Sequence, residues 1–196
     1  MENEKMLVTA EGIVLHNALS KVDRDIKAMN LAKKDAGHLR LLAEETLGMI
    51  KMMTGNFVAL MWLDRNKNEA MLHLKAKAEA MDSDKKKDLI SIATSGKNEK
   101  AKGFMGRIGD IFDSVMMDAM DETGIQEAYS QLNRADSEGG DYDAKWTLDS
   151  YRDSDGGAEA RDILEKSIVA NIAKDVVVGV KRDTIEMTIT MELKGV

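Results

Sequence analysis

The chain has 196 residues, a formal net charge of −7 and no cysteine; this is the length of one domain with a full hydrophobic core, and a disulfide framework, a thiolate nucleophile and a zinc–thiolate site are excluded. An acidic chain argues against a nucleic-acid binder, which usually carries a basic face, and the longest apolar run, residues 57–63, is far shorter than the ~20 residues that a membrane helix needs. Because no basic segment followed by an apolar run opens the chain, we see no signal peptide and expect one domain in the cytoplasm, without a nucleic-acid or membrane partner.

The first third of the chain predicts a strand followed by two helices. Residues 5–9, Lys-Met-Leu-Val-Thr, favour a short strand. Apolar residues spaced by three and four predict amphipathic helices over residues 11–30 and 35–53, because this spacing places them on one helical face. Thr54 and Gly55 are typical of the end of such a helix.

A β-hairpin is predicted next. Residues 57–63 form an apolar strand, and the polar residues 64–68 have the composition of a turn. In the return strand, about residues 70–78, apolar and polar side chains alternate, so its two faces differ in character. One face is apolar and would meet the core, and the other is solvated or functional and carries His73, Lys75 and Lys77.

The middle of the chain predicts two helices and an insertion. Residues 82–93 favour a short helix, residues 94–98 a polar loop, and residues 99–120 a long helix with the clearest apolar stripe in the chain. The acidic, glycine-containing stretch 131–158 is expected to be a loop or a partly disordered insertion. Four less polar residues would pin its middle to the body: Trp146, Thr147, Leu148 and Tyr151.

The chain closes with a predicted helix, residues 158–173, and a hairpin of residues 176–180 and 184–193. Apolar side chains alternate strictly with Thr and Glu in the last strand, which predicts an antiparallel sheet with helices on one side only. The order of elements therefore predicts an α+β fold, a two-layer α/β sandwich with helices on one face of a mixed or antiparallel sheet.

Two segments carry residue types that suit a nucleotide. Residues 42–49 read Leu-Ala-Glu-Glu-Thr-Leu-Gly-Met, whereas residues 94–98 and 102–106 combine hydroxyls, lysines and glycines near a helix start. With the order and lengths of the elements, these segments resemble the histidine-kinase-type ATPase fold of the GHKL superfamily, most closely its small bacterial anti-sigma-factor serine kinases. The resemblance covers about residues 5–116 and 174–193.

The resemblance implies a site for ATP and Mg²⁺ between the second helix and the segment 94–106. Glu44 stands where the family places the general base that activates the attacking water or hydroxyl. The phosphates would lie against residues of the glycine-containing segment, namely Thr94, Ser95, Gly96, Lys97, Gly103 and Gly106.

The chain departs from the family at two motifs. Gly48 occupies the position of the Asn that holds Mg²⁺, and Met49 does so if Glu45 is aligned in place of Glu44. The stretch 75–82 contains no glycine where the family has Asp-X-Gly-X-Gly, and a lysine stands near the adenine-reading Asp. A lysine cannot accept the amino hydrogen of adenine, so these departures weaken ATP recognition.

The candidate residues also have structural interpretations. Glu44 and Glu45 can belong to a solvated helix face. Gly103, Gly106 and Gly109 recur every third residue in a helical pattern, and each costs about 1 kcal/mol relative to Ala in a helix interior. Either close packing of another element or the approach of a ligand should offset that cost. No metal site is expected, because ligand spacing is lacking at His16, His38 and His73.

The expected function is that of a degenerate ATPase-like domain acting as a regulatory, anti-sigma-factor-like protein-binding module without ATP hydrolysis. A divergent ATP-binding protein or serine kinase of the anti-sigma type is the alternative. An unrelated α+β domain is a third hypothesis. A protein partner is expected, whereas a bound nucleotide and a homodimer both stay open.

Overall fold

A computed structural model of the chain describes eight stretches of it, residues 4–9, 12–52, 58–77, 103–115, 122–134, 142–153, 167–181 and 183–194. The short helix expected over 82–93 and the polar loop 94–98 lie outside these stretches.

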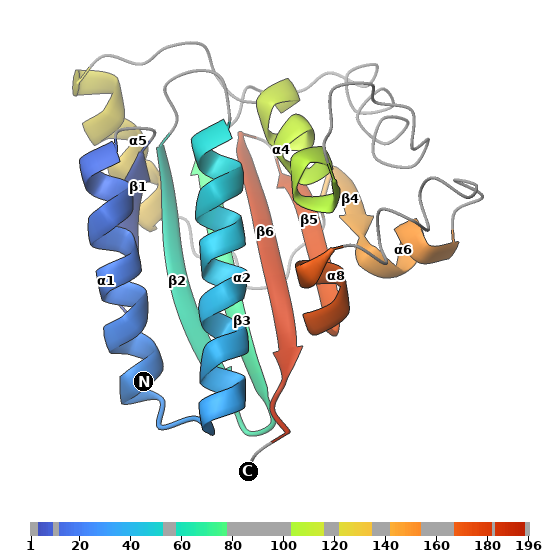
Figure 1. Ribbon diagram of the computed structural model, residues 1–196. Helices are drawn as coiled ribbons and strands as arrows, with labels where there is room; N and C mark the ends of the chain where they lie inside the picture. Colours follow the sequence, from blue (N-terminus) through green and yellow to red (C-terminus); the bar gives the residue numbers. More distant parts are fainter. Residues whose placement is uncertain are drawn as a thin grey trace.

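Six strands form one sheet in which every neighbouring pair is antiparallel (Figure 1). Across the sheet they run β1 (Met6–Thr9), β2 (Val58–Asn66), β3 (Glu69–Lys77), β6 (Thr184–Glu192), β5 (Asp175–Lys181) and β4 (Ala144–Thr147). The α+β class and the antiparallel pairing are therefore confirmed. Both hairpins were correctly predicted, because their alternating side chains match the two-residue period of a pleated strand.

The first face of the sheet carries the main core and five of the described helices (Figure 1). These are α1 (Gly12–Ala28), α2 (Lys33–Met52), α4 (Phe104–Val115), α6 (Leu148–Asp153) and α8 (Ile168–Ile172). The apolar side chains that alternate along the strands point into this layer, and Leu72, Met187 and Ile189 are almost fully buried there. The helical stripes predicted for α1 and α2 meet this face of the sheet.

The second face of the sheet is also covered in part, by helix α5 (Glu122–Arg134). Val58 and Leu60 of β2 pack there against Ala128 and Leu132 of α5, and all four are buried. The expectation of helices on one side only is therefore wrong over β2 and β3, which α5 contacts. The physical reason is that residues 58–63 of β2 are all apolar, so the second face of this strand must also be removed from water.

The expected insertion at 131–158 contributes to the sheet. Residues 144–147 form edge strand β4 on β5, with Trp146 opposite Val178, and α6 follows at once. Trp146, Leu148 and Tyr151 are buried, so the prediction that they pin this region to the body is confirmed. The expectation of a loop is wrong for residues 131–134, which belong to α5, and for residues 144–153, where the high acidic content of the stretch outweighed the signal of a short strand with an apolar face.

Three predicted boundaries also differ. Strand β2 continues to Asn66 and the turn holds only Lys67 and Asn68, since residues 64–66 still pair with 69–71. Helix α4 begins at Phe104 rather than at 99, because Gly103 has a φ of 105° that no α-helix contains. In the predicted helix 158–173, Ser167 caps α8: its Oγ accepts the Ala170 N–H at 3.1 Å.

None of the described helices is both long enough and apolar enough to cross a lipid bilayer.

Candidate functional site

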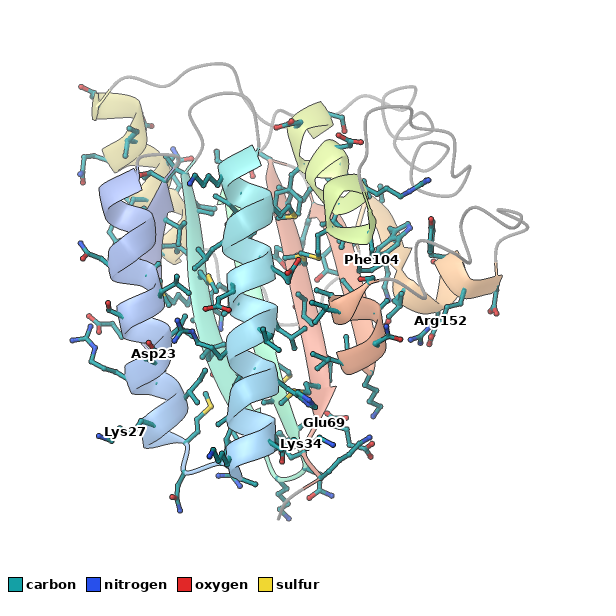
Figure 2. The ribbon with its side chains drawn as sticks, in the orientation of Figure 1. Asp23, Lys27, Lys34, Glu69, Phe104 and Arg152 are labelled. Atoms are coloured by element: carbon teal, nitrogen blue, oxygen red, sulfur yellow. The ribbon has the colours of Figure 1, made fainter. Side chains whose placement is uncertain are left out.

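Glu44 lies on the side of α2 that faces α1. Its Oε1 is 2.9 Å from Nη2 of Arg40, and Arg40 also pairs through Nη1 with Asp23 of α1 (Asp23 is labelled in Figure 2). The Glu44 side chain is 41% exposed. This carboxylate therefore takes part in a surface ion-pair chain that joins the two helices, the kind of contact that contributes little free energy.

The side of α2 that faces α4 carries Met49 instead. Met49 is 1% exposed, and a Cβ placed on Gly109 of α4 would lie 3.2 Å from its Cγ. Five positions of an α-helix correspond to about 140° of rotation, so Glu44 and Met49 face different ways. Close packing of α2 on α4 is therefore the reason for a glycine at 109.

Neither position aligned with the family's Mg²⁺ ligand offers an oxygen. Gly48 is exposed, with no atom within 4 Å of a built Cβ, and Met49 is buried between the helices. Mg²⁺ prefers carboxylate and carbonyl oxygens, which neither residue's side chain supplies. Within the described stretches, no group of three or more His, Asp or Glu side chains could hold a metal ion.

The start of α4 is the described part of the predicted phosphate-binding segment. Gly103 precedes the helix with a φ of 105°, a conformation that favours glycine, and its carbonyl accepts the Arg107 N–H at 3.2 Å. Gly106 is half-buried in the first turn. The other four predicted phosphate-binding residues lie outside the described stretches: Thr94, Ser95, Gly96 and Lys97.

A buried arginine lies one turn into α4, and the sequence analysis did not single it out. Arg107 is 9% exposed, and its guanidinium carbon is 5.8 Å from the centre of the Tyr151 ring. Tyr151, Trp146 and Phe104 form an aromatic cluster with ring centres 5.8 to 6.3 Å apart (Phe104 is labelled in Figure 2). The β4–α6 region thus packs against the start of α4 through a cation–π contact. This is the helix start where the resemblance to the ATPases implies phosphate binding.

The polar face of the first hairpin holds a second cluster, beside α5. The ring of Trp62 stacks on His73 with centres 4.8 Å apart and donates its indole N–H to Asp64 at 3.0 Å. His73 Nε2 lies 3.4 Å from the same carboxylate, and its Nδ1 is 3.1 Å from Oγ1 of Thr188 on β6. Burial lowers the pKa of His73, while Asp64 and Glu186 oppose that shift.

Asp64, His73 and Thr188 thus place a carboxylate, an imidazole and a hydroxyl in a row, the arrangement by which enzymes activate a hydroxyl as a nucleophile. Thr188, however, lies in the middle of β6, paired with His73 of β3 on one side and with Val177 of β5 on the other. Its backbone amide belongs to the sheet, so it cannot stabilise an oxyanion. The cluster is therefore best interpreted as a polar connection between β2, β3 and β6.

A buried ion pair lies one register step further along the same face. Lys75 Nζ is 3.2 Å from Glu186 Oε1, with only 4% and 12% of the two side chains exposed. The Tyr142 hydroxyl donates to Glu186 at 3.2 Å, and burial together with the Glu186 charge raises the pKa of Tyr142 to about 12. The Tyr142 ring lies directly on Gly179, where a Cβ would be 2.3 Å from its Cδ1. The prediction that Lys75 faces away from the core is confirmed, and the lysine is matched by a carboxylate.

Comparison with known proteins finds no matching family model, no matching curated protein and no matching solved structure.

Proposed function

We propose that this chain is a regulatory protein-binding module that has the general layout of a histidine-kinase-type ATPase and does not hydrolyse ATP. The proposal rests on the contacts that α2 makes at the positions where the ATPases carry their catalytic and Mg²⁺-binding residues. Its Glu44 is paired with Arg40, Gly48 has no side chain, and Met49 is packed against Gly109. Phosphoryl transfer depends on a positioned base and a bound Mg²⁺, so a helix with these contacts is suited to scaffolding rather than to catalysis.

The second face of the sheet supports the protein-binding part of the proposal. Helix α5 contacts β2 and β3, and no helix in the described stretches packs on β5 or β6 from this side. Val177, Thr188 and Thr190 are partly exposed there. Small β-branched side chains on a regular sheet give a flat surface of mixed polarity, similar in composition to the surfaces of non-obligate interfaces.

A nucleotide assay tests the catalytic part of the proposal. We expect no ATP hydrolysis above the buffer rate and no more than a marginal thermal shift with millimolar ATP and Mg²⁺. A Kd of ~10 μM at ~1 mM ATP would stabilise the fold by about 2.7 kcal/mol through mass action, which melting curves would readily detect. Turnover of ATP by the purified chain would contradict the proposal.

The protein-binding part needs its own measurement. Thr190→Lys places a bulky charge on the second face of β6, and Lys181→Glu changes a charge at the far end of β5 as a control. A partner captured by the wild-type chain should be purified and titrated against both variants. We expect Thr190→Lys to weaken binding by ~10-fold or more, equivalent to about 1.4 kcal/mol, and Lys181→Glu to have a smaller effect. Equal binding to Thr190→Lys and wild type would exclude this face as the contact surface.

A divergent nucleotide binder is the second candidate, and the start of α4 favours it. Gly103 opens the helix in a left-handed conformation, and Arg107 lies one turn further along. A helix start with basic residues nearby is a suitable place for phosphate. A large thermal shift with ATP that Lys97→Ala abolishes, without hydrolysis in either protein, would favour this candidate over the first.

A further inference from the structure

An open cavity of about 230 Å³ lies at the amino-terminal end of α2. Figure 2 shows Lys34 and Glu69 at this end of the molecule, beside the β2–β3 turn. Lys34, Asp35 and His38 line the cavity from α2, and the segment joining α8 to β5 lines it together with the end of β6. Apolar contacts come from Ile172, Ala173 and Met191.

Two carboxylates line the cavity, those of Asp35 and Glu192. Asp35 is 4% exposed, and its Oδ2 accepts the backbone N–H of Lys194 at 3.1 Å. Lys174 Nζ is 2.6 Å from Glu69 Oε1. The hydrogen bond and charge of Glu69, with a smaller contribution from the charge of Glu192, raise the pKa of Lys174.

Three other groups that can carry positive charge line the same cavity. The Lys34 and Lys194 side chains and the His38 ring make no hydrogen bond or ion pair with the described part of the chain. Lys34 and Lys194 are exposed, and His38 is half-buried. The lining therefore offers two lysine ammonium groups and an imidazole as hydrogen-bond donors beside an apolar surface, in a chain whose net charge is −7.

We propose that this cavity binds a small organic anion, with its carboxylate or phosphate group between Lys34, His38 and Lys194 and its short apolar part against Ile172 and Met191. Lysine and histidine donors suit both anionic groups, because hydrogen bonds to charged acceptors are the strong ones. Pockets for drug-sized ligands enclose roughly 300–1,000 Å³, so a cavity of about 230 Å³ suits a small metabolite better than a nucleotide. The site is independent of residues 42–49 of α2, the segment whose residue types suit a nucleotide, because these residues lie towards the opposite end of that helix.

The experiment is a titration of the whole chain with four probes: inorganic phosphate, a phosphate ester (glycerol 3-phosphate), a short monocarboxylate (butyrate) and a short dicarboxylate (succinate). Binding is followed by calorimetry and by the NMR signals of the histidine rings at constant ionic strength. We expect saturable binding of at least one organic anion, stronger than that of inorganic phosphate because the apolar wall adds contact. The stronger of the ester and carboxylate arms identifies the anionic group.

Variants distinguish a site from general attraction to a basic surface. Lys34→Gln should weaken binding by ~10-fold, the loss of about 1.4 kcal/mol that one charge-assisted contact supplies. Lys33→Gln is the matched control: it changes the same charge one position earlier, where the side chain is exposed and does not line the cavity, and should weaken binding less than ~2-fold. Melting curves of both variants establish that they are folded.

Two outcomes would overturn the proposal. One is the lack of saturable binding by every probe at tens of millimolar. The other is an equal effect of Lys33→Gln and Lys34→Gln, since this would indicate non-specific electrostatics at the chain surface.

Discussion

The presence of a glycine at several positions of this chain is explained by the side chain that lies directly against it. Gly179 on β5 carries the ring of Tyr142, and a Cβ there would come within 2.3 Å of the ring. Gly109 lets α4 approach Met49. Gly48, in contrast, is exposed in the middle of α2, and a Cβ there would meet no atom within 4 Å. Glycine is therefore required by packing at positions 179 and 109, whereas at position 48 it only lowers the stability of the helix.

Substitution by alanine should separate these cases. Gly179→Ala forces the Tyr142 ring to move and should destabilise the fold by ~1–3 kcal/mol, the usual cost of overpacking. Gly48→Ala should stabilise it by about 1 kcal/mol, since it only removes the helix penalty of glycine. Urea denaturation with unchanged m-values measures both. A neutral Gly179→Ala would mean that Tyr142 is held more loosely than its contact with Gly179 indicates.

His73 makes the stability depend on pH. Its pKa in the folded chain lies below the unfolded value of 6.5, chiefly because of burial. The unfolded chain therefore binds a proton more readily as the pH falls below 6.5, so the contribution of neutral His73 is complete above that pH and is lost on acidification.

The expected result is a melting temperature that falls more steeply from pH 6.5 towards pH 5 in the wild type than in His73→Gln. At pH ~8 the variant should itself be less stable by about 0.5–1.5 kcal/mol, because it loses the stacking on Trp62. Parallel pH profiles of the two proteins would show that His73 does not carry this dependence.

At the scale of elements, β2 and α5 explain why the sheet is covered on both sides. Strand β2 is apolar on both faces, so α1 and α2 cover one face and α5 the other. Strand β6 alternates instead, and in the described stretches its main apolar contacts are on the first face, with Tyr142 lying over Glu186 on the second. The sequence analysis did not single out α5, although Ile125, Ala128, Tyr129 and Leu132 have the spacing of one helical face.

The contribution of α5 to stability can be measured by replacing a buried leucine of α5 with alanine and comparing it with the same change at an exposed leucine of α2. Leu132 is fully buried between α5 and β2, so Leu132→Ala should cost ~2–5 kcal/mol of stability, the range for leucines in a core. Leu41 on α2 is 38% exposed, so Leu41→Ala should stay within about 0.5 kcal/mol. A loss below ~1 kcal/mol at Leu132 would mean that α5 is only loosely attached.

For the whole molecule, α2 connects two chemically different ends. Its amino-terminal end borders the cavity lined by Lys34, His38 and Lys194, and its carboxyl-terminal half packs on α4, whose start carries the predicted phosphate-binding glycines. We expect an anion that binds the cavity to raise the melting temperature by mass action, and Lys34→Gln to reduce that rise.

The candidate site was predictable only in part. Gly48 and Met49 can be recognised in the sequence as poor metal ligands, because the types of their side chains decide this alone. The pairing of Arg40 with Asp23 was not predictable, because Asp23 belongs to another helix, whereas Arg40 and Glu44 have the local i,i+4 spacing of a helical ion pair. Arg107 and Tyr151 are 44 positions apart, and nothing in their local sequence indicates that they meet.

The sequence by itself determined the first strand, the helices α1, α2 and α4, the two hairpins and the α+β class, because alternation and helical spacing are local properties of the chain. It also determined that the residues for Mg²⁺ and adenine binding depart from the ATPase pattern. Only the tertiary structure decided that α5 covers the second face, that residues 144–147 extend the sheet and that Asp64, His73 and Thr188 meet. It also decided that a cavity with lysine and histidine donors forms where α2, β6 and the α8–β5 connection come together. These features depend on contacts between residues far apart in the chain, and a local pattern contains no information about its distant neighbours.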